Sequence, residues 1–150
     1  MNPKFGSNYD ELIPEEIIKH PLSKTITESD NNLFCLLTMN HHPVHIDIEH
    51  AKQSHHGKIL VVGTLVLSLI VGLTVPEISG AAIANLEYSK IKHLGPVFLG
   101  DTLRAETKVI DKRLCSGNDS RGVVHVQTIG YNQKNEKIIS LERKVLLPVR

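Results

Sequence analysis

A short histidine-rich loop carries the residues of this sequence that are best suited to acid–base chemistry. It spans residues 38–47 and contains Asn40, His42 and His45. Histidine is the usual general acid or base near neutral pH, because its ordinary pKa lies close to that range. Asn40 cannot take a proton, but its amide can orient a water molecule or donate a hydrogen bond. We therefore expect His45 to transfer protons and Asn40 to position a reactant.

Gly63 marks a second candidate position, at the start of the long apolar run over residues 59–75. The first N–H groups of a helix have no intrahelical acceptor and lie at the positive end of the helix dipole. They can therefore stabilise an oxygen that becomes negative during a reaction. Because glycine also allows close approach to the backbone, we expect an oxyanion and substrate site at Gly63, flanked by Val62 and Thr64.

Several elements must position these residues, and the first half of the chain predicts helices. Thr27 and Asp30 fit a capping box at the start of a helix that should end near Met39. Asp47 is a plausible N-cap of a second short helix, closed by residues 55–57; as a cap it is a weaker candidate for substrate binding. The run over residues 59–75 is apolar on all sides, which favours a buried helix, and Pro76 should stop it.

The second half predicts strands separated by turns. Turn residues cluster at 93–96, 116–119 and 132–136. The predicted strands cover residues 21–26, 82–91, 102–114, 122–133 and 137–147. The fold class is therefore α+β, with an antiparallel sheet of about five strands wrapped around a long central apolar helix. We expect residues 1–150 to form a single domain, with residues 1–20 as an N-terminal extension.

Composition excludes several classes of protein. A formal net charge of +1 leaves no basic excess for binding nucleic acid. The apolar run is interrupted by Gly63 and Gly72 and is shorter than the roughly 20 residues of a membrane span, so no membrane association is expected. Residues 1–10 lack the apolar core of a signal peptide, and the two cysteines show no metal-type spacing. We expect a cytoplasmic protein, and no metal site, because Pro43 interrupts any helical pairing of His41 with His45.

Four segments occur in the order found in MaoC-like hydratases. They are residues 25–30, the pattern Pro43-x-His45-x-Asp47, Gly63 before an apolar helix, and residues 95–103. The chain resembles this family, which includes the (R)-specific enoyl-CoA hydratases, over about residues 25–145. The resemblance implies a single MaoC-like hot-dog domain. A narrower likeness to the mesaconyl-CoA hydratase-like subgroup rests on residues 27–31, 73–77, 84–86 and 109–113.

The resemblance also implies a reaction. His45 falls on the family's catalytic histidine, its aspartate falls on Asn40, and the asparagine before the proline falls on His42. The implied activity is that of a hydro-lyase, adding or removing water at the double bond of a short, branched or dicarboxylic enoyl-CoA such as mesaconyl-CoA. The implied partners are the acyl-CoA substrate and a second copy of the chain, with no cofactor beyond the CoA thioester.

Some alternatives stay open at this point. Either His45 serves both proton transfers, or His41 or His42 takes the second. Lys90, Lys92 and Arg104 could meet the CoA phosphates, although lysines on strands are usually solvated. The chain could instead be a non-catalytic acyl-CoA binding module or a hot-dog thioesterase. A thioesterase would want a carboxylate on the central helix, and residues 64–74 contain none.

Overall fold

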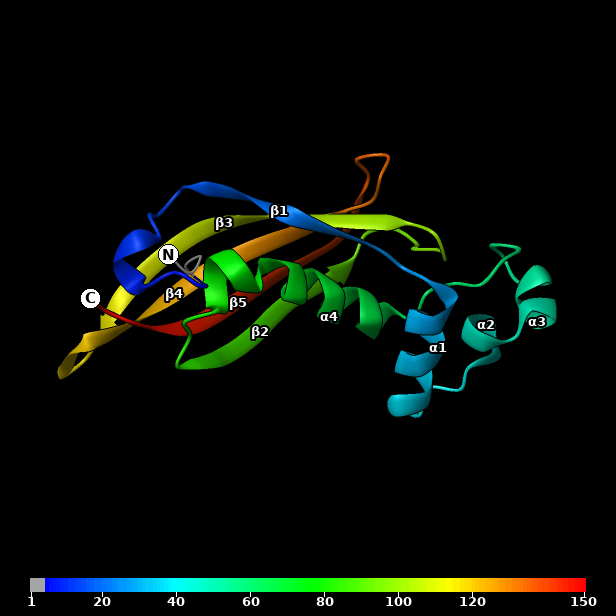
Figure 1. Ribbon diagram of the computed structural model, residues 1–150, viewed down its shortest axis with the longest axis horizontal. Helices are drawn as coiled ribbons and strands as arrows, with labels where there is room; N and C mark the ends of the chain where they lie inside the picture. The colour runs from blue at the N-terminus through cyan, green and yellow to red at the C-terminus, as the bar shows by residue number, and fades with distance from the viewer. Residues whose placement is uncertain (1–4) are drawn as a thin grey trace.

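The computed structural model describes residues 5–150, in which five strands form one antiparallel sheet in the order β1-β3-β4-β5-β2 (Figure 1). The strands are β1 (Ile17–Thr25), β2 (Ala84–His93), β3 (Thr102–Cys115), β4 (Asn118–Tyr131) and β5 (Lys137–Pro148). The helices are α1 (Glu28–Leu37), α2 (Pro43–Ile46), α3 (Ile48–Lys52) and α4 (Gly63–Thr74), with short turns at η1 (Tyr9–Glu11) and η2 (Val75–Ser79). The predicted sheet and long helix are confirmed.

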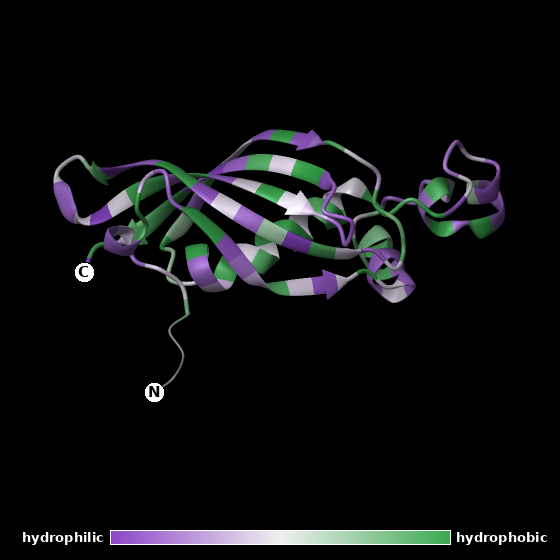
Figure 2. Cartoon of the chain, turned by 90° about the horizontal axis from the view of Figure 1, so that it is seen from above, coloured by the Kyte–Doolittle hydropathy of each residue, from purple (hydrophilic) through white to green (hydrophobic). Residues whose placement is uncertain are grey.

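Alternating side chains direct one face of the sheet toward α4. In β3 and β4 buried residues alternate with more exposed ones, and Figure 2 shows the corresponding alternation of hydrophobic and hydrophilic positions. Such alternation is expected for strands that pack on one face. Ile70 of α4 is completely buried in this layer, and burial of such a side chain stabilises the fold by roughly 1.5–3 kcal/mol.

The core consists of two apolar clusters with a polar layer between them. Leu141 belongs to the cluster around Val66 and Ile70, whereas Val145 belongs to the cluster around Leu12. Arg143 lies between them on β5, only 1% exposed. The same layer contains His20, Thr74, Thr107 and Thr128, all buried. Its hydrogen bonds join Arg143 to Thr74, and His20 through Thr107 to Thr128.

Helix ends follow their local sequence signals. The Thr27 hydroxyl accepts from the Asp30 N–H, and the Asp30 carboxylate accepts from the Thr27 N–H, so the predicted capping box is confirmed. A hydrogen bond from Lys24, followed by those from Thr27, lowers the pKa of Asp30 to about 2. The first short helix after α1 begins at Pro43, and the Asp47 carboxylate caps α3 as predicted.

Several predicted boundaries are wrong. The first strand begins at Ile17 rather than residue 21, and Pro21 falls within its irregular section between Lys19 and Ser23, which an edge strand tolerates. The second short helix ends at Lys52, before residues 55–57.

Two turns also differ from expectation. Pro76 does not end the central helical segment, because the chain continues as a π-type turn to Ser79. Proline is compatible with the first positions of such a turn, where its missing N–H is not needed. Asn118 and Asp119 belong to β4, so the hairpin turn is confined to Ser116 and Gly117, where Gly117 adopts a φ of +74°.

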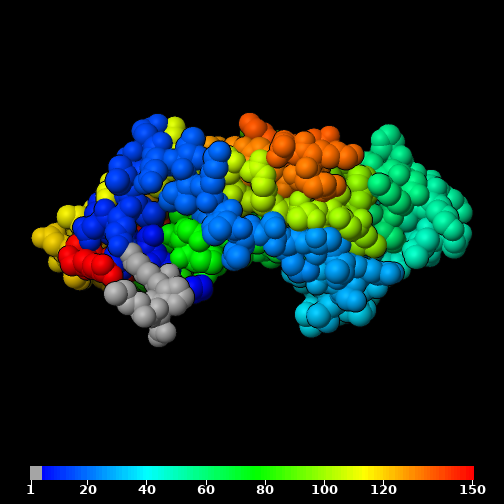
Figure 3. All heavy atoms as spheres, turned by 45° about the horizontal axis from the view of Figure 1, so that its top comes forward, coloured from blue at the N-terminus to red at the C-terminus, as the bar shows by residue number. Residues whose placement is uncertain are grey.

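The molecule is elongated, and its helices lie mainly at one end and along one face. α2 and α3 project beyond the sheet at the end opposite the C-terminus (Figure 1). The space-filling view shows the same segment as a distinct projection (Figure 3). α4 is not covered on all sides, since Thr64, Ser68 and Gly72 are exposed on its outer face. Within residues 5–150, no helix is long and apolar enough to cross a membrane.

Candidate functional site

The candidate site lies where α2 contacts Leu60 in the segment that leads into α4, and the end of α1 leads into it. Met39 adopts a φ of +60° directly after this helix. The Met39 N–H donates to the Leu36 carbonyl, and the Asn40 N–H donates to the Cys35 carbonyl at 3.0 Å. These two hydrogen bonds form a Schellman motif, in which glycine usually occupies the left-handed position that Met39 takes here. It fixes the backbone of Asn40 at the start of the histidine-rich loop.

The Asn40 side chain lies within a local turn. Its carbonyl oxygen accepts a hydrogen bond from the His42 N–H at 3.4 Å. The Asn40 side chain is half-buried, and among the described residues its amide NH₂ donates no hydrogen bond. Asn40 therefore serves as a turn residue whose NH₂ group is still free to contact a reactant.

His42 has a structural role at the start of α2. Its ring Nδ1 accepts a hydrogen bond from the Val44 N–H at 3.2 Å, which caps the helix. The residue is exposed, and among the described residues its Nε2 makes no hydrogen bond. Asp47 is likewise engaged, since its Oδ1 accepts from the His50 N–H at 3.0 Å. Both side chains are therefore occupied in capping.

His45 is oriented by the segment that leads into α4. Its Nδ1 lies 2.6 Å from the carbonyl oxygen of Leu60. A carbonyl oxygen only accepts, so Nδ1 carries the hydrogen and the neutral ring keeps its lone pair on Nε2. The Leu60 N–H also donates to the Val44 carbonyl at 3.2 Å. The imidazole is therefore held in the tautomer that a proton acceptor needs at Nε2.

The start of α4 offers two free N–H groups. Val62 is 2% exposed, and its N–H donates to the Asn31 Oδ1 at 3.0 Å. Among residues 5–150, neither the Gly63 N–H nor the Thr64 N–H donates a hydrogen bond. The N–H groups that a substrate oxygen can reach are therefore those of Gly63 and Thr64, whereas Val62 is already occupied.

His93 packs against Gly63, a contact that the sequence analysis did not foresee. A Cβ atom at position 63 would lie 2.9 Å from Cε1 and 3.0 Å from Nε2 of the His93 ring. Both distances are shorter than ordinary contact, so any larger residue at position 63 would displace the His93 ring. His93 ends β2 and was assigned only to a turn, and no local pattern in the sequence joins it to Gly63.

Asn31 is a second residue whose contact with the site was not predicted from the sequence. It lies on α1, is completely buried, and donates from Nδ2 to the His45 carbonyl at 2.9 Å. A signal does exist, because Asn31 and Cys35 are four residues apart on the buried face of a helix. A buried amide at such a position must find hydrogen-bond partners.

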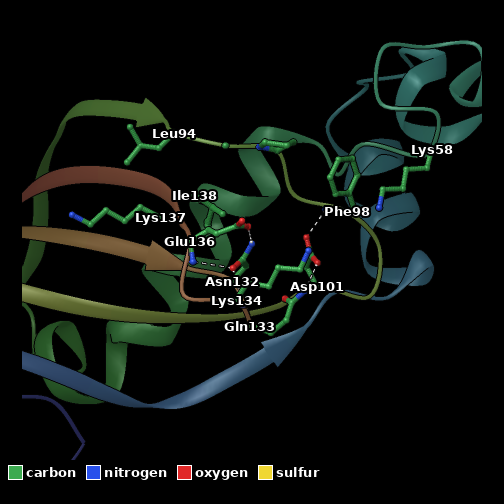
Figure 4. A pocket seen from close by; sticks show the side chains of 12 residues that line it. Lys58, Leu94, Phe98, Asp101, Asn132, Gln133, Lys134, Glu136, Lys137 and Ile138 are labelled. Atoms are coloured by element: carbon green, nitrogen blue, oxygen red, sulfur yellow. Dashed lines mark hydrogen bonds between the residues drawn. The ribbon is translucent and has the colours of Figure 1, made fainter.

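Two pockets adjoin this region. The first, of about 440 Å³, is lined by Leu60, Gly63 and His93 and continues along residues 94–97. The second, of about 400 Å³, shares residues 94–96 with the first and is bordered by Lys58, Lys134 and Lys137. Figure 4 shows Phe98 and Lys58 on one side of the second pocket and Asn132 and Glu136 on the other. The two pockets are therefore neighbours, one at Gly63 and the other at a surface bordered by lysines.

Two of the basic residues considered for CoA phosphates lie elsewhere and are paired. Lys90 contacts Glu142 at 3.0 Å, and Arg104 contacts Glu106 at 2.8 Å. None of the three candidates, Lys92 included, lines either pocket. Histidines gather in the loop, with the His42 ring 5.8 Å from that of His45. Within residues 5–150, no three His, Cys, Asp or Glu side chains are arranged to hold a metal ion.

Comparison with known proteins defines the class. The MaoC-like domain family matches residues 11–132, and the chain therefore belongs to the MaoC-like domain family. Mesaconyl-CoA hydratase of Cereibacter sphaeroides is 35% identical over 150 residues, which cover 100% of this chain and 43% of that protein. The predicted resemblance to MaoC-like proteins, and to this subgroup in particular, is confirmed.

Solved structures agree with this class. A putative MaoC domain protein dehydratase from Chloroflexus aurantiacus superposes with a TM-score of 0.94 at 30% identity, over 100% of this chain and 42% of that one. A Mycobacterium tuberculosis protein with a double hotdog fold gives a TM-score of 0.88 at 18% identity, over 97% and 45%. The fold is therefore the predicted hot-dog fold. The chain spans less than half the length of these three relatives.

Proposed function

We propose that this chain is a hydro-lyase that adds water to, or removes it from, a short enoyl-CoA. The observation that carries the proposal is the anchoring of His45 to the segment that leads into α4. The Leu60 carbonyl that fixes the imidazole stands three residues before Gly63, whose N–H is free among the described residues. A proton-transfer group and donors for a negative oxygen are the two requirements for hydrating an unsaturated thioester.

The proposed reaction proceeds through an enolate. Nε2 of His45 takes a proton from water as the water oxygen adds to the β-carbon. The electrons of the double bond move onto the thioester oxygen, which accepts hydrogen bonds from the Gly63 and Thr64 N–H groups. The imidazolium of His45 then returns the proton to the α-carbon. Dehydration follows the same steps in reverse, so one histidine suffices for both transfers.

Asn40 has an orienting role in this proposal. Its carbonyl oxygen is turned toward the His42 N–H, and its NH₂ group is the part left for the attacking water or the acyl group. Because an amide holds no proton to exchange, it cannot replace the carboxylate found at this position in the family. His42 and Asp47, occupied as helix caps, shape the loop around His45.

The substrate we propose is a branched or dicarboxylic C5 ester of the mesaconyl-CoA and methylmalyl-CoA type. The relative named mesaconyl-CoA hydratase supports this class. The thioester would lie in the pocket at Gly63, and the pantetheine chain would follow residues 94–96 into the neighbouring pocket. Lys58, Lys134 and Lys137 at that pocket supply positive charge for the CoA phosphates.

We also propose that the chain forms a homodimer through β2. This strand ends the sheet, and its apolar side chains Leu86, Tyr88 and Ile91 are 52%, 46% and 40% exposed. An uncovered edge strand with apolar side chains is a ready surface for pairing with another strand. Because His93 ends the same strand, such a dimer would lie next to the Gly63 pocket.

The experiment that tests the function measures hydration of crotonyl, mesaconyl, itaconyl and longer-chain CoA esters by the purified protein. We expect turnover with at least one short ester. His45→Ala should lower kcat by about 10²–10⁴-fold, since a positioned general base contributes that much. Exchanging CoA for pantetheine in the best ester should lower kcat/KM, because the phosphates then lose their lysine contacts.

A matched control is His55→Ala, which removes an exposed histidine that lines neither pocket. It should leave turnover unchanged. Equal activity of His45→Ala and the unmodified protein would rule out the catalytic role of His45. Tight binding of CoA esters without turnover would instead indicate a binding module, and release of free CoA a thioesterase.

A further inference from the structure

We infer that Asn31 is a positioning residue that holds His45 and the free N–H groups of α4 in one rigid unit. The inference rests on the proposed function, because it assigns to Asn31 the alignment of the proton-transfer group with the oxyanion donors. The loop that contains His45 does not include this residue, which comes from α1. Residue 31 lies in a segment that carries the subgroup likeness, but the sequence assigned no role to it.

The side chain of Asn31 joins two separate segments with both of its polar atoms. Nδ2 donates to the His45 carbonyl at 2.9 Å, and Oδ1 accepts from the Val62 N–H at 3.0 Å. The residue is completely buried, so neither bond competes with bulk water. Loss of either partner would leave a buried polar group unsatisfied, which is unfavourable.

These two bonds close a ring with the bond made by the imidazole. His45 donates from Nδ1 to the Leu60 carbonyl at 2.6 Å, and the chain from Leu60 reaches Val62 within two residues. From Val62 the ring returns through Asn31 to the His45 backbone. Both the backbone and the side chain of His45 are therefore fixed relative to the segment that precedes Gly63. This closed set of hydrogen bonds restricts the imidazole more than the Leu60 bond alone could, because it also fixes the His45 backbone that carries the imidazole.

The same contact determines which N–H groups remain for a substrate. The Val62 N–H points into the buried amide, so it cannot serve a substrate oxygen. The next two N–H groups along the helix stay free among the described residues. Asn31 thereby holds the backbone of His45 with one end of its amide group. With the other end it holds Val62, the residue before the oxyanion donors.

The test combines two substitutions with turnover measurements. Asn31→Leu keeps the approximate size of the side chain and removes both bonds. Asn31→Asp keeps an acceptor for the Val62 N–H and removes the donor to His45. We expect both to lower kcat by about 10–100-fold with KM changed by less than about threefold, because misplacement of a catalytic group by about 1 Å has effects of this size.

Amide hydrogen exchange of the unmodified protein provides an independent measurement. The Val62 N–H should exchange about 10-fold or more slowly than those of Gly63 and Thr64, since it alone is hydrogen-bonded. Asn31→Asp should retain this protection and Asn31→Leu should lose it. Val62 exchange as fast as that of Gly63 would overturn the inference even if no variant folds.

A control variant distinguishes misalignment of His45 from a general loss of stability. Val126→Ala removes buried volume from the other apolar cluster, away from Asn31, and should lower stability without lowering kcat at temperatures where the protein is folded. If Val126→Ala lowers kcat as much as Asn31→Asp, the effect is general destabilisation and the inference is wrong. An unmodified protein without turnover would refute the proposed function, whereas the Val62 exchange pattern would still decide the role of Asn31.

Discussion

At the scale of single residues, Gly63 is constrained from two sides. The residue lines the pocket proposed for the thioester, and a Cβ atom on it would meet the ring of His93. Close approach by a substrate, the role expected for this glycine from the sequence, stays a proposal. The contact with His93 is a separate reason for glycine at this position.

Gly63→Ala should therefore destabilise the protein by about 1 kcal/mol, because the added methyl group meets the His93 ring at 2.9 Å. The penalty should disappear in a His93→Ala background, where the space is empty. Thermal unfolding of the two single variants and the double variant measures the coupling. Additive effects, with a coupling below about 0.3 kcal/mol, would show that the ring moves away freely.

Residue by residue, prediction succeeded where a role depends on local sequence. The capping function of Asp47 was readable from its position before a short helix, and the structure confirms it. Asn31 and His93 could not be assigned in this way. Their partners, Val62 and Gly63, lie 31 and 30 residues away in the chain, and only the folded structure brings them together.

At the scale of elements, the polar layer ties β1 to the turn that follows α4. Nδ1 of His20 donates to the Glu77 carboxylate at 2.7 Å, and Nε2 accepts from the Thr107 hydroxyl at 2.8 Å. Burial lowers the pKa of His20, although Glu77 acts in the opposite direction, and the charge of Arg143 lowers it further. The imidazole is therefore held neutral in the native state.

The stability contributed by this neutral histidine should depend on pH. Because the folded pKa lies below the unfolded value of 6.5, the unfolded state binds more protons between these two pKa values. The unfolding free energy should be highest above about pH 6.5 and fall as the pH decreases toward the folded pKa. Denaturant unfolding at a series of pH values measures this slope.

Two variants check the assignment. His20→Gln should flatten the slope below about pH 6.5, because no imidazole is left to protonate at this position. Glu77→Gln should make it steeper, since the carboxylate that favours the charged ring is gone. An unchanged slope in His20→Gln would show that other groups determine the acid sensitivity.

Helices and strands were predicted well where the hydrophobic periodicity of the sequence is strong. They were predicted poorly where tertiary contacts determine where an element begins or ends. The alternation in β3 and the apolar run of α4 are visible in a single sequence. The early start of β1 is not, because Ile17–Lys19 are held by pairing with residues 106–108 of β3 rather than by an apolar pattern. The extension of the helical segment past Pro76 is likewise a product of packing, since Ile78 is completely buried.

At the scale of the whole molecule, the sheet has two different edges. β1 is interrupted by Pro21 and its pairing with β3 is irregular, which protects it from further strand addition. β2 contains no proline, although its pairing with β5 is also irregular. Both edge strands carry exposed apolar side chains, Ile17 and Leu22 in β1 and Leu86 and Ile91 in β2. The proline in β1 therefore favours association through β2 rather than β1.

Replacing Leu86 and Ile91 together by lysine should convert the proposed homodimer into monomers, because charges on an edge strand oppose pairing. Analytical ultracentrifugation measures the change in mass. Leu114→Lys alters an equally exposed leucine near the end of β3 and should leave the dimer intact. A monomeric unmodified protein, or equal dissociation by the control, would exclude β2 as the interface.

The projection formed by α2 and α3 has a consequence for how such a protein can change its chemistry. It meets the segment before α4 at the main chain of Leu60, whose N–H donates to the Val44 carbonyl and whose carbonyl accepts from the His45 ring. Apart from His45, these bonds do not depend on side chains, so exposed residues of the projection such as Glu49, Lys52 and Gln53 can vary with little effect on the sheet. The sheet and α4 thus form a constant framework, and the histidine-rich loop is the part that can change. Its alignment with the framework depends on Asn31 of α1, which belongs to neither.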